Sequence, residues 1–389
     1  MRYLIAFLVP AMFPFLMQLP QARAALDPSL QRETDAAIRR AVKWLVAHQS
    51  PAGYWSNPDY PALTALPLWA IIRSGLPADK TVAAAVNYIR SCARPDGGIY
   101  REPKQKRRGG GLKNYNTALC MIALFESGQK DVLPLVLKAR RFLARSQHLG
   151  DDIYYGGMGY DASTDRAYAD LSNSYIAYEA MRLTESAEDM RRRGQRADLN
   201  WKAARRFLAR VQNLPQFNDL PWAGGDSDEL GGFIYRPDKS QAGTYTDTNG
   251  VIRFRTYGSM TYAGLLSLIY AEVDRNDPRV RSAFDWACRH WTLDENPGMG
   301  ADGLFYFYNV LAKCLSVLGR SSIPLQDGTT INWRTELARR LVSLQKIEAD
   351  GGLGYWVNEK SGRWWESDPV LVTAYSLLAL EMAAGRPPE

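Results

Sequence analysis

The stretch Gln49-Ser50-Pro51-Ala52-Gly53-Tyr54-Trp55 decides the fold, because looser versions of it recur along the chain. Each version places one to three glycines shortly before an aromatic residue. Glycine ends a helix by adopting backbone angles closed to other residues, and the aromatic side chain can pack the turn against a neighbour. The five further versions occupy residues 97–100, 156–160, 231–235, 303–306 and 351–356. Six occurrences indicate an internal repeat.

Two kinds of helical segment flank each glycine stretch. The segment before it is amphipathic: apolar residues such as Ile38, Val42 and Leu45 recur at helical spacing among charged residues such as Arg39 and Arg40. The segment after it is apolar or small around most of its circumference, and we expect it to be buried. These buried segments cover residues 63–72, 117–125, 172–183, 260–270, 308–318 and 370–380.

Six such hairpins predict an all-α fold, an (α/α)6 toroid with an inner ring of apolar helices and an outer ring of amphipathic ones. Residues 25–389 would form this single domain. An open solenoid of stacked hairpins is the alternative. We favour closure because the units number six and the apolar segments would leave an exposed concave surface too hydrophobic.

The N-terminus resembles a cleaved signal peptide covering residues 1–24. Arg2 precedes an uncharged run over residues 4–20, and Ala22-Arg23-Ala24 supplies a small-x-small cleavage site. A retained membrane span is the alternative, but three prolines interrupt the run. We therefore expect an exported protein, periplasmic or extracellular, with no transmembrane segment after cleavage.

The remaining composition restricts partners and cross-links. The formal net charge of +7 is a weak basic bias, and without a binding motif we expect no nucleic-acid partner. Four cysteines are too few and too scattered for a disulfide framework, although one bridge stays possible in an oxidising compartment. They are Cys92, Cys120, Cys288 and Cys314.

Residues 49–55 fit the Gln-x-x-x-Gly-x-Trp repeat of squalene and oxidosqualene cyclases, so the chain resembles the terpenoid cyclase and protein prenyltransferase superfamily. The stretch from Asp294 to Tyr308 is similar to uncharacterised bacterial exported proteins with prenyltransferase and squalene-oxidase repeats. The resemblance covers roughly residues 35–384. It implies that the inner ring encloses an aromatic cavity for an isoprenoid chain. The superfamily's catalytic motifs are missing, however.

No Asp-x-Asp-Asp proton-donor motif occurs, and the nearest string, Asp226-Ser227-Asp228-Glu229, reads better as a solvated turn. The zinc ligands of protein prenyltransferases are also missing. His48, His148 and His290 all fall at the ends of outer segments, so we expect no metal and no cofactor.

Polar and aromatic residues near the starts of the buried segments are the candidate ligand contacts, because all six starts would converge on one mouth of the ring. Helix capping and core packing are the competing interpretations. An aspartate enclosed by these tyrosines would have a raised pKa and become a candidate general acid; Asp302 is the first choice and Asp170 the second. The candidate binding residues are Tyr115, Asn116, Asn173, Tyr257, Thr261, Tyr306, Tyr308, Asn309 and Tyr375.

Three functions remain open. The first is binding, isomerisation or cyclisation of an apolar isoprenoid-type small molecule. The second is a non-catalytic exported scaffold that binds another envelope protein. The third is a polysaccharide lyase or glycoside hydrolase, which needs acidic or Tyr/Asn pairs across an open cleft; its candidates are Asp161, Asp170, Asp302, Tyr306 and Asn309. The long segment 212–258 would lid the ring or bind a partner.

Overall fold

The chain forms two sets of helices. A computed structural model describes residues 26–102, 111–161, 168–191, 193–349 and 351–385. Within these residues the odd-numbered α-helices are α1 (Pro28–Ala47), α3 (Asp79–Ser91), α5 (Leu133–Ser146), α7 (Trp201–Val211), α9 (Pro278–Arg289) and α11 (Trp333–Leu344). The even-numbered ones are α2 (Ala62–Ser74), α4 (Lys113–Glu126), α6 (Leu171–Leu183), α8 (Gly258–Tyr270), α10 (Leu304–Val317) and α12 (Pro369–Ala383). The prediction of a helix-rich protein is confirmed.

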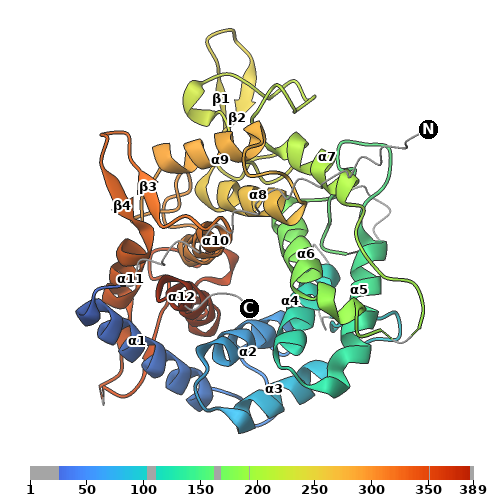
Figure 1. Cartoon of the computed structure of the whole chain (residues 1–389), viewed down its shortest axis with the longest axis vertical. Coiled ribbons are helices and arrows are strands. Elements are labelled where there is room, and N and C mark those ends of the chain that lie inside the picture. Colours follow the sequence, from blue (N-terminus) through green and yellow to red (C-terminus); the bar gives the residue numbers. More distant parts are fainter. Residues whose placement is uncertain (1–25, 103–110, 162–167, 192, 350, 386–389) are drawn as a thin grey trace, which may run out of the picture.

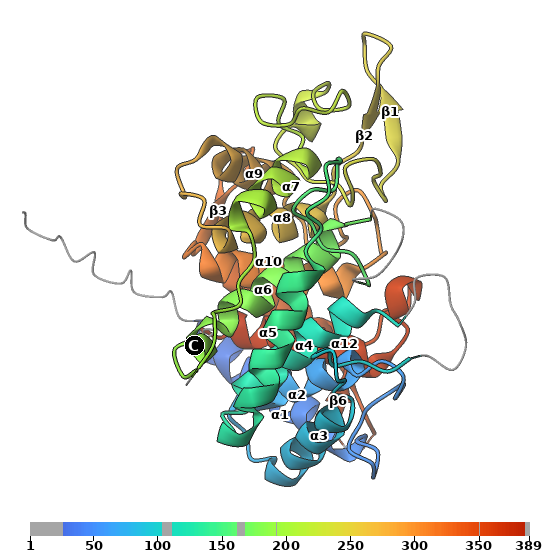
Figure 2. The same cartoon turned by 90° about the vertical axis from the view of Figure 1, so that its right-hand side faces the viewer.

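The even-numbered helices contact one another in cyclic order. Each packs on the next one along the chain, and α12 packs on α2. The odd-numbered helices lie outside them, as Figure 1 shows, and Figure 2 shows the structure turned by 90°. Because each even-numbered helix has neighbours on several sides, nearly its whole circumference is buried. This burial explains why those segments carry little charge.

A glutamine present in four of the six repeats joins the outer helix to its neighbours. The Gln147 side-chain amide donates to the carbonyl of Gly156 at 2.8 Å and to that of Asn200, just before α7, at 3.2 Å. The amides of Gln49 and Gln212 make the equivalent pairs of hydrogen bonds. One side chain thus joins the end of its own helix, the following turn and the start of the next outer helix.

The glycine of the repeat allows a close approach between hairpins. Gly156 has φ +96°, and a Cβ atom there would lie 1.9 Å from the carbonyl oxygen of Ala203 in α7. Gly231 has φ +90° and meets Ser282 in α9 in the same way, at 2.1 Å. These positions therefore need glycine both for backbone angle and for space.

A serine or threonine hydroxyl on the even-numbered helix accepts a hydrogen bond from the turn that precedes this helix. The backbone N–H of Trp55 donates to Thr64 at 3.2 Å. Four other repeats contain the same bond from the turn to a serine or threonine: Ile99 to Thr117, Met158 to Ser174, Phe233 to Thr261 and Trp356 to Thr373.

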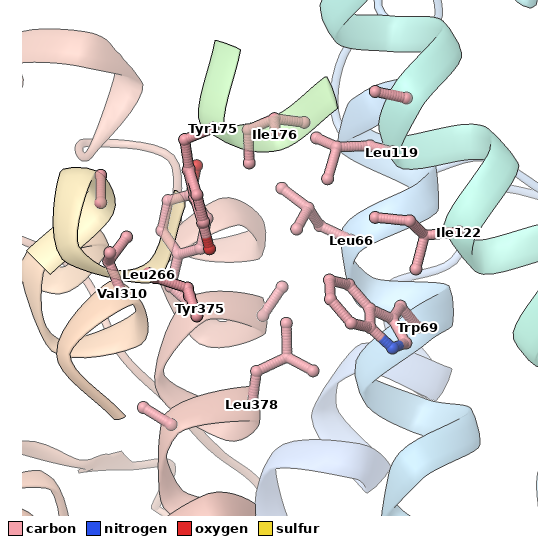
Figure 3. Close-up of a cluster of buried hydrophobic side chains, with 14 of the residues drawn as sticks. Leu66, Trp69, Leu119, Ile122, Tyr175, Ile176, Leu266, Val310, Tyr375 and Leu378 are labelled. Atoms are coloured by element: carbon pink, nitrogen blue, oxygen red, sulfur yellow. The ribbon is translucent and has the colours of Figure 1, made fainter. Parts of the chain in front are cut away.

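Apolar side chains from the even-numbered helices, which we call the inner helices, pack against one another between these helices. Figure 3 shows Leu66, Leu119, Ile176, Leu266 and Leu378 converging from five helices. Toward the C-terminal ends of the helices, this core contains a buried ion pair between Glu179 of α6 and Lys313 of α10, 2.9 Å apart.

Short hairpins and turns decorate the helices, a feature that the sequence patterns did not predict. The antiparallel pairs are β1 (Thr244–Thr246) with β2 (Ile252–Phe254), β3 (Ser322–Pro324) with β4 (Thr330–Asn332), and β5 (Lys346–Ile347) with β6 (Gly354–Tyr355). The β1–β2 hairpin belongs to segment 212–258 and projects beyond the helices (Figure 1). The 3-10 helices are η1 (Lys130–Val132), η2 (Glu185–Glu188), η3 (Ser227–Glu229) and η4 (Arg363–Trp365).

All four cysteines are free, and three of them are buried. The proposed signal peptide, residues 1–24, lies outside the described residues. Among the helices that are described, none combines the length and the apolar character that crossing a bilayer requires.

Candidate ligand cavity

A cavity of about 390 Å³ lies at the N-terminal ends of the inner helices. All six inner helices contribute to its wall, as expected from the convergence of their starts. Its volume lies in the usual range for small-molecule sites, roughly 300–1,000 Å³. Nine of the twenty lining residues are aromatic: Tyr60, Tyr115, Tyr160, Tyr235, Tyr257, Tyr306, Trp364, Trp365 and Tyr375.

Five of the nine predicted binding residues line this cavity: Tyr115, Asn116, Tyr257, Tyr306 and Tyr375. The hydroxyls of Tyr115 and Tyr375 lie 3.4 Å apart, and the rings of Tyr306 and Tyr375 meet at a steep angle with centroids 5.8 Å apart. Asn116 accepts from the backbone N–H of Ala62 at 2.9 Å and so also links α4 to α2.

The other four predicted binding residues do not line the cavity, because each has a structural partner elsewhere. Asn173 binds Asp170, and Thr261 accepts the turn N–H of Phe233. The Tyr308 hydroxyl donates to the carbonyl of Leu293, and the Asn309 amide donates to the carbonyl of Tyr375. Spacing along a helix placed them near the mouth but could not reveal these partners.

Asp302 does not meet the conditions set for a general acid. Its carboxylate accepts from the Ser361 hydroxyl at 2.6 Å and from the Arg363 guanidinium at 2.8 Å, and its side chain is 29% exposed. These two partners hold the pKa of Asp302 below its ordinary value. Tyrosines do not enclose it, and it lies outside the cavity wall. The dense aromatic run after Asp302 was therefore a misleading signal.

Asp170 does meet those conditions. It is fully buried at the start of α6, where it accepts from the backbone N–H of Asn173 at 2.8 Å. Interactions with the Tyr168 and Tyr235 side chains also favour its charged form. Burial nevertheless outweighs these bonds and raises the pKa of Asp170 to about 6. The Tyr235 side chain stands between this carboxyl and the cavity, which it helps to line.

A small hydroxyl cluster surrounds Tyr235. Its oxygen lies 3.1 Å from the hydroxyl of Tyr160 and 3.0 Å from that of Tyr168. Burial, and then the charge of Asp170, raise the pKa values of both Tyr160 and Tyr168. These tyrosines therefore keep their protons, and their three hydroxyls form a hydrogen-bonded cluster beside the cavity.

Glu366, which the sequence analysis did not select, is the carboxyl that lines the cavity directly. It is 1% exposed and accepts from the backbone N–H of Tyr306 at 2.8 Å and from the Asn358 amide at 2.7 Å. Burial raises the pKa of Glu366 to about 7 in spite of these bonds. The adjacent pair Trp364-Trp365 was the available signal, since it places aromatic surface beside an acid just before an inner helix.

Two tryptophans form part of the cavity's rim. Trp364 and Trp365 have φ values of 54° and 70°, which residues other than glycine rarely adopt. Trp365 packs edge-on against Tyr60 with centroids 4.8 Å apart. Next to them, Arg363 is fixed by Asp302 and by the Gln241 side chain at 3.1 Å. This contact joins the α11–α12 connection to segment 212–258 beside the mouth.

The helices and their cyclic contacts define a terpenoid cyclase-like fold, which solved structures share over nearly the whole chain. The type II terpene cyclase MstE from Scytonema is similar in a variant bound to its product, merosterolic acid A, with a TM-score of 0.53 and 14% sequence identity, covering 93% of this chain and 100% of that one. Its apo structure gives a TM-score of 0.52 at 13% identity, covering 92% of this chain and 99% of that one. Another variant, in complex with its substrate geranylgeranyl dihydroxybenzoate, gives 0.50 at 13% identity, covering 93% and 100%. No family model and no curated protein matches the chain.

Proposed function

We propose that this protein binds an apolar isoprenoid-type ligand in the cavity and isomerises or cyclises it by acid catalysis. The observation that carries the proposal is a wall with nine aromatic residues that also contains the buried carboxyl of Glu366. Aromatic faces suit an apolar chain and attract positive charge. The likeness to terpene cyclases adds support for the fold.

We propose further that the fold is a closed (α/α)6 toroid. The support is the cyclic set of contacts among the inner helices, together with the contact of α1 with both α11 and α12. A closed ring suits the proposed function because its centre is shielded from water except at the ends. Shielding raises the pKa of an enclosed carboxyl and preserves a reactive cation.

In the proposed chemistry, a protonated carboxyl donates its proton to one carbon of an alkene and leaves positive charge on the other. A second double bond can attack this cation, which closes a ring and moves the positive charge to another carbon. With or without ring closure, a carbon next to the final cation then loses a proton to the carboxylate, so the ligand keeps its atomic composition. Asp170 would deliver its proton through the Tyr235 hydroxyl, and the tyrosine faces would stabilise the cation.

Mass spectrometry of organic extracts from the purified protein tests this proposal. We expect an isoprenoid to co-purify with the wild type and to be lost from a Tyr306→Ala variant, which shortens the aromatic wall. An Asp170→Asn variant should retain ligand but accumulate unconverted substrate. Asp302→Asn is the matched control and should behave as wild type. Absence of lipid from every preparation would count against the proposal.

The other two functions receive less support. A glycoside-processing site needs acidic residues facing each other across an open cleft, whereas Asp302 is engaged by Arg363 and Asp161 accepts from the backbone N–H of Lys113 at 3.1 Å. A binding scaffold for an envelope protein would use the projecting β1–β2 hairpin, where Ile252 is 67% exposed. Export to the periplasm or beyond is likewise a proposal, which N-terminal sequencing of the mature protein tests.

A further inference from the structure

The described cavity wall contains one acidic residue and no basic residue. Among its twenty residues, Glu366 is the only carboxyl, and none is lysine, arginine or histidine. The rest of the wall consists of apolar side chains, hydroxyls and two amides. This distribution of charge bears on which end of a ligand the cavity can accept.

Among the described residues, two cations near the rim are paired with acids. The Arg363 guanidinium binds Asp302 at 2.8 Å, and the Lys113 ammonium binds Glu102 at 2.9 Å. Neither belongs to the cavity wall. An anionic group that entered would therefore gain no cationic partner from the described wall, and it would be brought close to Glu366.

Glu366 is held in place from one side. Its two oxygens accept from the Tyr306 N–H and the Asn358 amide, so the carboxyl cannot turn away from the cavity without losing both bonds. Tyr306 and Trp365 join it in the wall, and Tyr375 stacks edge-on against Tyr306. A fixed carboxylate beside aromatic faces is an arrangement that attracts positive charge.

We infer that Glu366 makes this cavity select isoprenoids whose polar end carries no negative charge. This inference rests on the proposed function and narrows its substrate class. Neutral ligands such as polyenes and alcohols would be accepted, ligands with a cationic end would be held most strongly, and prenyl diphosphates would be rejected. A diphosphate would lose its hydration and be repelled by a carboxylate in a site of low polarity. This unfavourable free energy exceeds the favourable free energy of burying the apolar chain.

A simpler structural role for Glu366 is to cap the start of α10, where it accepts a backbone N–H. Glu366→Gln separates the two roles. Glutamine keeps an oxygen that can accept the same hydrogen bond, but it removes the charge. A role limited to capping would leave ligand selection unchanged in this variant.

The experiment compares three probes with one apolar chain, namely farnesyl-trimethylammonium, farnesol and farnesyl diphosphate, and repeats the set with geranylgeranyl chains. Binding to the full-length mature protein is measured by isothermal titration calorimetry at pH 8, where the carboxylate of Glu366 predominates. We expect the ammonium probe to bind about tenfold more tightly than the alcohol, and the diphosphate about tenfold more weakly or undetectably. Glu366→Gln should abolish the ammonium preference and leave alcohol binding nearly unchanged. Glu295→Gln, which removes an exposed acid outside the cavity wall and leaves the Arg363–Asp302 pair intact, is the control and should preserve the wild-type order.

Two results would overturn the inference. One is a diphosphate that binds as tightly as the alcohol, and the other is an ammonium preference that survives Glu366→Gln in a protein with an unchanged circular dichroism spectrum. Failure of all six probes to bind the wild type would instead contradict the proposed function, so the two failures are distinguishable.

Discussion

The side-chain amide of Gln345, at the end of α11, donates a hydrogen bond of 2.9 Å to the backbone carbonyl of Ala37 in α1, 308 residues earlier in the chain. The Gln345 oxygen accepts in turn from the Nε atom of Arg40 at 2.9 Å. Gln345 thereby joins the last repeat to the first. Gln147, at the equivalent position of the third repeat, likewise donates to the carbonyl of the residue before α7. Since the two helices are distant in sequence, this bond acts between the ends of the fold.

Gln345→Leu should lower the free energy of unfolding by about 1–3 kcal/mol. The substitution conserves volume but leaves the Arg40 guanidinium without this acceptor. Urea denaturation followed by circular dichroism measures the loss. Gln195→Leu, at an exposed glutamine, is the matched control and should change stability by less than about 0.5 kcal/mol. Equal effects of the two substitutions would show that the glutamine contact contributes nothing specific.

Gly156→Ala should destabilise the protein by roughly 3 kcal/mol, because the new Cβ atom would overlap the Ala203 carbonyl and force α7 away from its neighbour. Gly128→Ala tests backbone angle alone: Gly128 has φ +65°, and nothing lies within 4 Å of a Cβ there. Gly128→Ala should lower the free energy of unfolding by about 1–2 kcal/mol, because alanine is strained in the left-handed conformation. Thermal unfolding of both variants separates crowding from conformation, and identical melting temperatures would refute the close approach.

The sequence was sufficient for the repeat and for the two kinds of helix, since both follow from local periodicity. Segment 117–125, for example, lies inside α4, and its lack of charge follows from its position between neighbouring helices. The glutamine and glycine contacts were not predictable in detail, because each joins a turn to a helix of the next repeat. Their atoms are adjacent only once both hairpins have packed.

The site was less predictable for the same physical reason. Asp170 and Asp302 both precede an inner helix in sequence, yet one is enclosed by tyrosines and the other is paired with Arg363 at the rim. Burial and partner decide the pKa of a carboxyl, and both depend on residues distant along the chain. Glu366 was overlooked because the sequence offered no charge pattern around it, only two neighbouring tryptophans.

Lys313→Met should destabilise the protein by about 3–5 kcal/mol, because it leaves the Glu179 carboxylate buried without its cation. Lys313 also lies over the Trp69 ring, with its nitrogen 4.3 Å from the centroid. Adding Glu179→Gln to Lys313→Met should recover much of the stability, since the uncompensated charge is gone. Guanidinium denaturation of the two single variants and the double variant completes the cycle. Additive losses would show that the two residues act independently.

Glu366→Gln should alter how stability depends on pH. Burial raises the pKa of Glu366 from 4.5 to about 7, so the folded state holds this proton over a range in which the unfolded state has released it. The protonated carboxyl therefore contributes fully to the free energy of unfolding of the wild type below about pH 4.5. This contribution is lost as the pH rises to about 7. Glutamine does not titrate, so the stability of the wild type relative to the variant should fall by roughly 3 kcal/mol across this window. The raised pKa of Asp170, about 6, acts in the same direction but is common to both proteins and cancels. Urea denaturation at half-unit steps from pH 4 to 8 measures the difference, and Glu295→Gln, at an exposed acid, should give a flat one. A flat difference for Glu366→Gln as well would mean that burial does not raise the pKa of this carboxyl and that it is ionised at neutral pH in the folded protein.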